Sequence, residues 1–220
     1  ELKRNYTAVI RPGTSELVQL GAEDAENITL VDEGNADWVL ATSNKHNRIP
    51  IQWEGRTKYN GYMISTVDGK RKLVEADCPG FFTASPKGNF ISWYNPFQKN
   101  YFAYNTSTGK VKNITEKIKV PLYDTEHDSP GMPGNIGVAG WTARDKYILV
   151  YDEYDIWQVD PAGVEEPVNI TNGWGRKHKT EFRYIKYLKD KRFIEADELI
   201  HLFAFNKENK YSGFFSKKVN

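Results

Sequence analysis

The triplet Asn-Ile-Thr occurs three times in this chain, as Asn27-Ile28-Thr29, Asn113-Ile114-Thr115 and Asn169-Ile170-Thr171. The first two copies are 86 residues apart, which is two periods of 43, and the last two are 56 apart, one period plus an insertion. The copy that this period lacks falls near residue 72, where Gly69–Val74 has the same pattern of a turn followed by a strand. Four short strands and their turns occupy a period in the low forties, so the spacing predicts β-propeller blades.

Turn and strand signals repeat in the same order around the triplets. The first set is the turn 85–89, the strands 90–94 and 100–104, the turn 106–110 and the strand 111–115. The second set is the turn 141–145, the strands 146–151 and 155–159, the turn 160–163 and the strand 167–171. An earlier set contains Asp68-Gly69 between two alternating apolar runs, which is a strong hairpin signal. Residues 116–140 and 172–197 are predicted as long connections, and 199–205 with 211–215 as a further hairpin.

Composition also indicates sheets. Aromatic residues make up 14% of the chain, and aromatic and β-branched side chains fit the half-buried surface of a sheet. We therefore expect an all-β fold with about four to five blades of four antiparallel strands, forming part of a larger propeller. This partial β-propeller domain covers residues 1–220, with approximate blades 1–29, 30–74, 75–115, 116–171 and 172–220. An ordinary β-sandwich with coincidental turns is the alternative.

Charge and cysteine content exclude several kinds of partner and site. Thirty Lys and Arg stand against 29 Asp and Glu, a formal net charge of +1, without the basic excess of a nucleic-acid-binding surface. The basic run Arg176-Lys177-His178-Lys179 is short and is interpreted as a solvated loop. The single cysteine, Cys78, excludes an internal disulfide framework and a multi-cysteine metal site. No apolar stretch approaches the ~20 residues of a membrane span, and the polar start Glu1–Asn5 does not have the pattern of a signal peptide.

Acidic residues gather in two connections. Asp124, Glu126, His127 and Asp128 fall within five residues of the connection 116–140, and such oxygen and imidazole ligands could bind a divalent cation. No calcium-loop spacing supports this, so a contact with a neighbouring domain is the preferred role for that loop. Tyr151–Asp155 links two predicted strands, and its acids are interpreted as turn residues. We therefore expect no metal and no cofactor.

Nucleophilic catalysis by serine has a recognisable sequence signal. No Gly-x-Ser-x-Gly elbow occurs in the 220 residues. The four histidines, His46, His127, His178 and His201, lie in predicted loops or a strand without a serine in a matching context. We therefore expect no catalytic residue in this chain.

Several of these stretches resemble a known family. The turn Ser85-Pro86-Lys87-Gly88 before the strand 90–93 is similar to a blade repeat of prolyl-oligopeptidase-family serine peptidases, which TolB-type propellers also carry. Gly140–Asp160, followed by Asn169–Gly173, looks like a subgroup of large exported peptidases of that family, and Gln52–Arg56 belongs to the same likeness. The likeness covers nearly the whole chain, although only its last segment is distinctive.

The resemblance implies the N-terminal propeller domain of a dipeptidyl-peptidase-like serine peptidase, exported to the periplasm or cell envelope. Such a propeller is not catalytic; it gates and orients peptide substrates for a C-terminal α/β-hydrolase domain of the same polypeptide, which is absent from this chain. Glu165-Glu166 invites comparison with the paired glutamates by which dipeptidyl peptidases hold a substrate's amino terminus. The pair follows the turn 160–163 inside a hairpin, so it is interpreted as a solvated turn and no function is carried onto it.

Two other functions stay open at this point. A stand-alone TolB-like binding module would need a complete ring. A five-bladed glycoside-processing enzyme would need carboxylates that converge on a central channel, and no residues mark three such acids. Blades cut from a longer ring also leave unpaired sheet edges, so we expect possible self-association of this segment.

Overall fold

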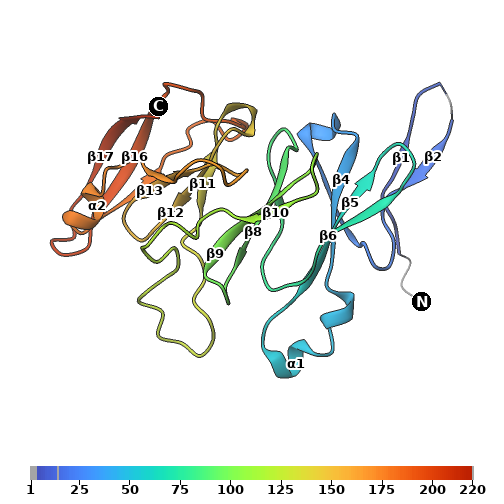
Figure 1. Cartoon of the computed structure of the whole chain (residues 1–220), viewed down its shortest axis with the longest axis horizontal. Helices are drawn as coiled ribbons and strands as arrows, with labels where there is room; N and C mark the ends of the chain where they lie inside the picture. Colours follow the sequence, from blue (N-terminus) through green and yellow to red (C-terminus); the bar gives the residue numbers. More distant parts are fainter. Residues whose placement is uncertain (1–3, 14, 220) are drawn as a thin grey trace. The chain divides into compact units, whose positions relative to one another are not determined.

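The computed structural model describes residues 4–13 and 15–219 (Figure 1). Glu1–Lys3, part of the polar start considered above, lie outside these residues. Strands dominate the described chain, and its helices are short. No helix among the described residues has the length and apolar character needed to cross a membrane. The elements are β1 (Ala8–Ile10), β2 (Leu17–Gln19), β3 (Asn27–Leu30), η1 (Asp32–Gly34), β4 (Trp38–Ser43), η2 (Lys45–Asn47), α1 (Ile51–Glu54), β5 (Tyr59–Ser65), β6 (Arg71–Cys78), β7 (Thr83–Ala84), β8 (Phe90–Asn95), β9 (Asn100–Asn105), β10 (Val111–Asn113), β11 (Val138–Trp141), η3 (Ala143–Asp145), β12 (Ile148–Tyr151), β13 (Ile156–Val159), β14 (Val168–Asn169), α2 (Trp174–Lys177), β15 (Thr180–Tyr184), β16 (Leu199–Asn206) and β17 (Ser212–Lys218).

The strands form successive antiparallel sheets in chain order. Three sheets have four strands, in the orders β3-β4-β5-β6, β10-β9-β8-β7 and β11-β12-β13-β14. The last sheet has three, β15-β16-β17, and β1 pairs with β2 alone. Each four-stranded sheet is an up-and-down meander, which is the topology of a propeller blade. The expected all-β fold of four-stranded antiparallel, blade-like sheets is therefore confirmed.

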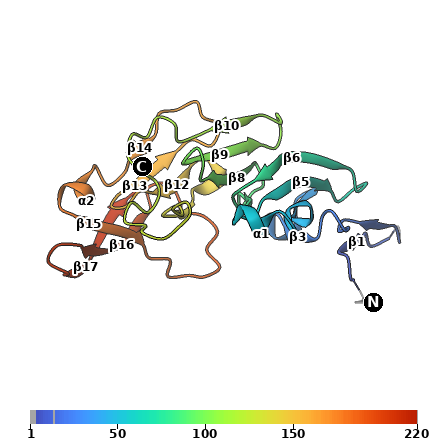
Figure 2. The ribbon, with the colours of Figure 1, turned by 90° about the horizontal axis from the view of Figure 1, so that it is seen from below.

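The chain divides into two compact units, residues 1–93 and 94–220. In the first unit, β4 and β5 lie at the centre of their sheet and supply Val39, Ala41 and Ile64 to a fully buried apolar cluster. In the second unit, the larger cluster joins Leu149 and Ile156 to the inner side chains of the last sheet, including Ile200 and Leu202. Figure 2 shows the three strands of that last sheet side by side, in orange to red.

Two copies of the Asn-Ile-Thr triplet occupy the same place in their sheets, and the first copy does not. Asn113 ends β10 and Asn169 ends β14, each the last strand of a four-stranded sheet, whereas Asn27 begins β3, the first strand of its sheet. The interpretation of the 86-residue spacing as two blade periods was therefore wrong. The boundaries expected after residues 29 and 74 fall inside β3 and β6, whereas those after 115 and 171 fall between sheets.

The stretch predicted as a long connection at 172–197 contains regular structure. Residues 174–177 form helix α2 and residues 180–184 form β15, the first strand of the last sheet. The predicted hairpin at 199–205 and 211–215 is present as β16 and β17. The missed elements are short, and α2 has a glycine at its second position, so neither a helical period nor a strand pattern marks this segment.

Candidate functional site

The two equivalent triplets cap the strands beside them in the same way. Within each triplet the Asn side-chain oxygen accepts the backbone N–H of the Thr, at 3.2 Å for Asn113 and Thr115 and 3.0 Å for Asn169 and Thr171. Each Thr hydroxyl then accepts a backbone N–H from the adjacent strand, 2.9 Å from Tyr101 in the first case. These bonds satisfy backbone donors at the points where the meander turns.

The residue that accepts a hydrogen bond from the Thr hydroxyl differs between the two sheets. Thr115 Oγ1 donates to the amide oxygen of Asn100 at 2.9 Å, whereas Thr171 Oγ1 donates to the carboxylate of Asp155 at 2.6 Å. Asp155 is completely buried, and it also accepts the backbone N–H groups of Gly175 (3.0 Å) and Arg176 (3.1 Å). The carboxylate therefore fastens helix α2 to the end of β14 and the start of β13.

Gly175 makes this attachment possible. A Cβ atom at this position would lie 2.7 Å from the backbone oxygens of both Tyr154 and Thr180 and 2.9 Å from Asp155 Oδ1. Only a residue without a side chain lets α2 approach the loop 151–155 this closely.

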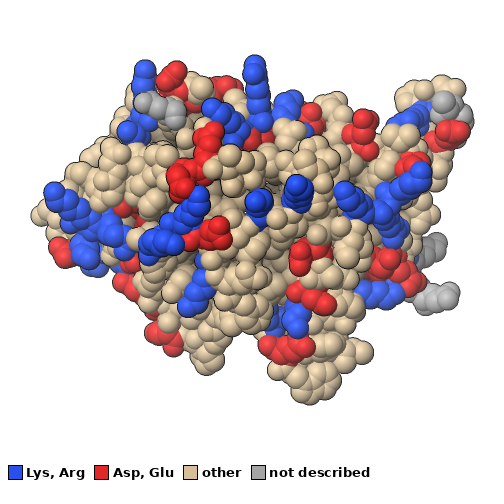
Figure 3. All heavy atoms as spheres, viewed as in Figure 1, with Lys and Arg blue, Asp and Glu red and all other residues tan. Residues whose placement is uncertain are grey.

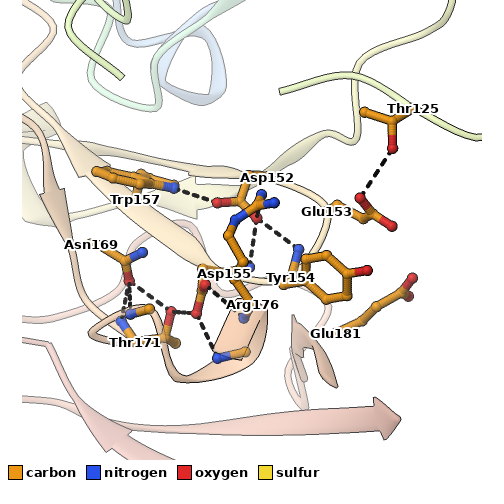
Figure 4. A network of polar contacts seen from close by, with 12 residues as sticks. Thr125, Asp152, Glu153, Tyr154, Asp155, Trp157, Asn169, Thr171, Arg176 and Glu181 are labelled. Carbon is orange, nitrogen blue, oxygen red and sulfur yellow. Dashed lines mark hydrogen bonds and ion pairs between the residues drawn. The ribbon is translucent and has the colours of Figure 1, made fainter. Parts of the chain in front are cut away.

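Asp152 is a second fully buried carboxylate in the same loop, shown with its partners in Figure 4. It accepts the backbone N–H groups of Tyr154 (2.7 Å) and Asp155 (2.9 Å) and the indole N–H of Trp157 (2.8 Å). The Arg176 guanidinium lies 3.2 Å from it. The structure thus places Asp152 and Asp155 in a tight turn with their oxygens directed at protein donors, an arrangement that stabilises the turn.

Lys207 gathers three glutamates from three different segments. Its ammonium lies 2.6 Å from Glu126, 2.7 Å from Glu153 and 3.8 Å from Glu181. Burial by itself lowers the pKa of Lys207, but the hydrogen bonds to Glu126 and Glu153 outweigh it, and the net pKa is raised above the ordinary value. Burial raises the pKa of Glu153, but the hydrogen bond and the charge of Lys207, together with hydrogen bonds to Thr125 and Tyr154, more than reverse this, so the net pKa is lowered. A lysine held protonated in this way cannot act as a nucleophile or base at neutral pH.

The loop that contains Asp124, Glu126, His127 and Asp128 does not bring these four side chains together. Glu126 reaches Lys207, whereas Asp124 accepts the backbone N–H of Glu126 at 2.9 Å and His127 lies 3.5 Å from the Ser129 hydroxyl. Within the described residues, no group of three or more His, Cys, Asp or Glu side chains is placed to hold a metal ion. The ion pair between Glu126 and Lys207 attaches this loop to the turn between β16 and β17.

Glu165 and Glu166 point to different partners. The Tyr147 hydroxyl donates to Glu165 at 2.8 Å, and Glu166 forms an ion pair with Lys117. Because the two carboxylates do not converge, they do not form a joint receptor for one ammonium group. Asp160 organises this hairpin by accepting the backbone N–H groups of Val164 (2.8 Å) and Glu165 (3.0 Å).

Each of the four histidines has a described polar partner. His46 Nε2 lies 2.9 Å from Asp77 Oδ1, and His178 Nδ1 lies 2.9 Å from the Trp174 carbonyl oxygen. His201 Nδ1 lies 3.3 Å from the Ser216 hydroxyl. Of the described residues, none with a carboxylate hydrogen-bonds His201, so the third member of a serine triad is missing from this pair.

A hollow of about 600 Å³ opens beside α2 and the last sheet. Its walls are aromatic: Trp174 stacks on His178 with ring centroids 4.1 Å apart, and Trp174, Phe182 and Phe215 contact one another at 5.3–5.6 Å. Leu202 also lines it, and Lys177 and Lys217 bring positive charge to it. Sequence analysis missed this hollow because its residues belong to the supposed connection and to two later strands. An apolar pocket with a few charged groups is the usual form of a binding site.

Charged side chains of both signs are interspersed on the face of the molecule shown in Figure 3. Within the second unit, the buried and half-buried acids described above accept hydrogen bonds from backbone N–H groups or Trp157, or form ion pairs with Arg176 or Lys207. This polar network holds the loops, and the aromatic hollow beside it has room for a ligand.

A scan of protein families and a search of curated proteins both found no match to this chain. Among solved structures, it is similar to a putative TolB from Agrobacterium tumefaciens (12% identity, TM-score 0.43, 94% of this chain and 73% of that one). It is also similar to TolB from Acinetobacter baumannii (11% identity, TM-score 0.33, 96% and 59%). A third match is an acylaminoacyl peptidase in complex with Z-Gly-Gly-Phe-chloromethyl ketone (11% identity, TM-score 0.35, 84% and 32%). The chain thus spans 59% of the second structure and about a third of the peptidase; the blade topology rests on its own strand order.

Proposed function

We propose that this chain is a non-catalytic β-propeller domain of a prolyl-oligopeptidase-like serine peptidase. Its role is to gate and orient peptide substrates for an α/β-hydrolase domain outside these 220 residues. The observation that carries the proposal is the run of successive four-stranded meanders, in one of which two buried acids, Asp152 and Asp155, hold the turn between β12 and β13. The acids of this turn serve as hydrogen-bond acceptors for the protein itself, which suits a domain that encloses an active site without taking part in the reaction.

The chemistry of the loops supports a structural role for their acids. Asp152 and Asp155 accept backbone N–H groups in a buried turn, and Lys207 is shared among three glutamates. A general acid or base needs access to a substrate proton and a pKa near the working pH. The sequence likeness of Gly140–Asp160 and Asn169–Gly173 is what supports the proposal that these blades belong to a peptidase.

We also propose that the parent protein is exported to the periplasm or cell envelope. This rests on the same family likeness alone. Fractionation of cells that express the full-length gene, with an antibody raised against residues 1–220, tests it directly. Recovery of the protein in the cytoplasmic fraction would contradict export.

A stand-alone TolB-like binding module is the second candidate function. The aromatic hollow favours it, because a ligand-sized, lysine-flanked pocket on a module without catalytic groups is suited to binding. Under this alternative the module needs no hydrolase domain.

The coding sequence on both sides of residues 1–220 separates the two candidates. A downstream in-frame domain of about 250 residues with a Gly-x-Ser-x-Gly elbow is expected for the peptidase. The full-length protein should then react with a fluorophosphonate probe, and replacing the elbow serine by alanine should abolish labelling. The segment 1–220 is the matched control and should remain unlabelled. A stop codon directly after residue 220 would favour the binding module.

A further inference from the structure

A pocket of about 230 Å³ lies in the second unit, beside Lys99 and Asn100 at the start of β9. Its other wall is formed by residues of the segment 116–123, which follows β10. Thr115 fixes the two walls to each other, because its hydroxyl accepts the N–H of Tyr101 at 2.9 Å and donates to Asn100 at 2.9 Å. The sheet β7–β10 therefore holds both walls of the pocket in place.

The segment after β10 begins as the segment after β14 does. Thr115 and Thr171 are the equivalent residues of their triplets. Ile118 N donates to Thr115 O at 3.0 Å, and Trp174 N donates to Thr171 O at 3.1 Å. The same first turn follows each threonine, so residues 115–118 correspond to residues 171–174.

The two segments differ in what their next N–H groups bind. After β14, the N–H groups of residues 175 and 176 donate to the buried carboxylate of Asp155. Residues 119 and 120 stand at the corresponding places after β10, and no described residue accepts a hydrogen bond from their N–H groups. Asn100 takes the place of Asp155 as the acceptor of the Thr hydroxyl. The earlier sheet thus has a neutral amide and a pocket where the later sheet has a carboxylate.

The lining of this pocket is positively charged. Lys99 and Lys119 line it, and neither forms an ion pair with a described residue. Lys99 Nζ lies 3.4 Å from the Tyr123 hydroxyl, and Lys119 Nζ donates to the Glu116 carbonyl oxygen at 3.2 Å. Because an ammonium group has three donors, each lysine keeps donors for a ligand. Glu116 is the one acid among the lining residues, so two lysines against one acid leave a formal charge of +1.

We propose that this pocket binds the phosphate or carboxylate group of a small molecule, which takes the place that the Asp155 side chain has in the next sheet. Ammonium and backbone N–H groups form strong charge-assisted hydrogen bonds with oxyanions, and the lining residues Lys99, Lys119 and Val120 supply both kinds of donor. This inference stands whether or not the blades belong to a peptidase.

Inorganic phosphate is the first probe, titrated into the isotope-labelled full chain at constant ionic strength with chloride as the exchanged anion. We expect saturable chemical-shift changes at the N–H groups of Lys119 and Val120, with a dissociation constant on the order of 1 mM. Acetate is the second probe, and the tighter of the two anions identifies whether the ligand carries a phosphate or a carboxylate. Absence of shifts at these N–H groups up to about 50 mM of either anion would overturn the site.

Lysine variants test which cations hold the anion. Lys99→Met and Lys119→Met should each weaken binding of the tighter anion by about five-fold. Lys110→Met removes an exposed lysine that does not line the pocket, and it should bind as the wild type does. Near-UV circular dichroism of each variant verifies the fold. Equal affinities of all three variants would show that the two lysines of the pocket do not form the site.

Two further variants change the charge of the pocket in opposite directions. Asn100→Asp puts a carboxylate where Asp155 has one, and it should weaken binding by about ten-fold because the protein then supplies its own anion. Glu116→Gln removes the acid of the lining and should tighten binding by about two-fold. Unchanged binding by Asn100→Asp would overturn the correspondence with Asp155, and weaker binding by Glu116→Gln would overturn the choice of an anion as the ligand.

Discussion

Thr171 and Asp155 form a buried hydrogen bond in which the hydroxyl donates to the carboxylate at 2.6 Å, while the same hydroxyl accepts the Ile156 N–H at 3.1 Å. Asp155 extends this contact to α2 through Gly175 and Arg176. The end of a fourth strand, the start of a third strand and the wall of the aromatic hollow are thereby joined at one carboxylate.

Removing that carboxylate should destabilise the second unit strongly. We expect Asp155→Ala to lower the free energy of unfolding by about 3 kcal/mol, because Thr171 and two backbone N–H groups lose a charged acceptor. Asp155→Asn keeps one oxygen, as Asn100 has in the preceding sheet, and should cost about half as much. Urea unfolding of the full chain measures both. Equal losses in the two variants would show that the second carboxylate oxygen of Asp155 does not contribute to holding α2.

The three triplets should respond differently to the same substitution. Thr115→Val and Thr171→Val each remove a strand cap and should each destabilise by about 1–2 kcal/mol. Thr29→Val is the matched control: Thr29 is exposed and its hydroxyl makes no described hydrogen bond, so the change should stay within about 0.5 kcal/mol.

The same urea titrations give these values. A loss for Thr29→Val as large as the other two would mean that the first copy of the triplet acts as the other copies do, contrary to its position in β3.

Gly175→Ala should displace α2 and damage the hollow. The new Cβ would meet two backbone oxygens at 2.7 Å, and backbone atoms cannot move aside cheaply. We expect a loss of about 2–3 kcal/mol and a changed near-UV circular dichroism signal from the aromatic walls. Gly213→Ala on β17 is the control, since no atom lies within 4 Å of its added Cβ, and it should leave the spectrum unchanged.

The Lys207 cluster should make stability depend on pH at both extremes. The pKa of Glu153 is lowered from 4.5, so its contribution is complete above that value and is lost as the pH falls through the lower folded pKa. The pKa of Lys207 is raised from 10.5, so its contribution is complete below that value and is lost as the pH rises through the folded pKa.

Lys207→Met tests this dependence. We expect a loss of about 2 kcal/mol at pH 7 that shrinks below about pH 4 as Glu153 is protonated. Lys70→Met removes an exposed partner of Asp68 and should leave the stability essentially unchanged across the same pH range. A Lys207→Met effect that stays constant from pH 7 to pH 3 would contradict the ionic origin of the contribution.

Some of the candidate site was visible in the sequence. The Tyr151–Asp155 turn was located, because Asp side chains that cap their own backbone act over two or three residues, as Asp152 does toward Tyr154 and Asp155. The hydrogen-bond partners of Asp155 could not be located from the sequence, because Thr171 lies 16 residues away and Gly175 lies 20 residues away. The local sequence of α2 does not predict a helix, because a four-residue helix with glycine at its second position depends on tertiary contacts for its stability.

The sequence by itself determined the all-β class, the hairpin turns and the four-stranded repeat unit, because turn chemistry and strand alternation act between near neighbours. Only the tertiary structure decided which triplets are equivalent, which acids share Lys207 and where the hollow lies. Those features depend on strand order and burial, which bring together side chains from distant parts of the chain. Asn27 and Asn169 each begin an Asn-Ile-Thr triplet. Their different places in the sheets make Asn27 the first residue of a strand and Asn169 a side chain that caps the Thr171 N–H.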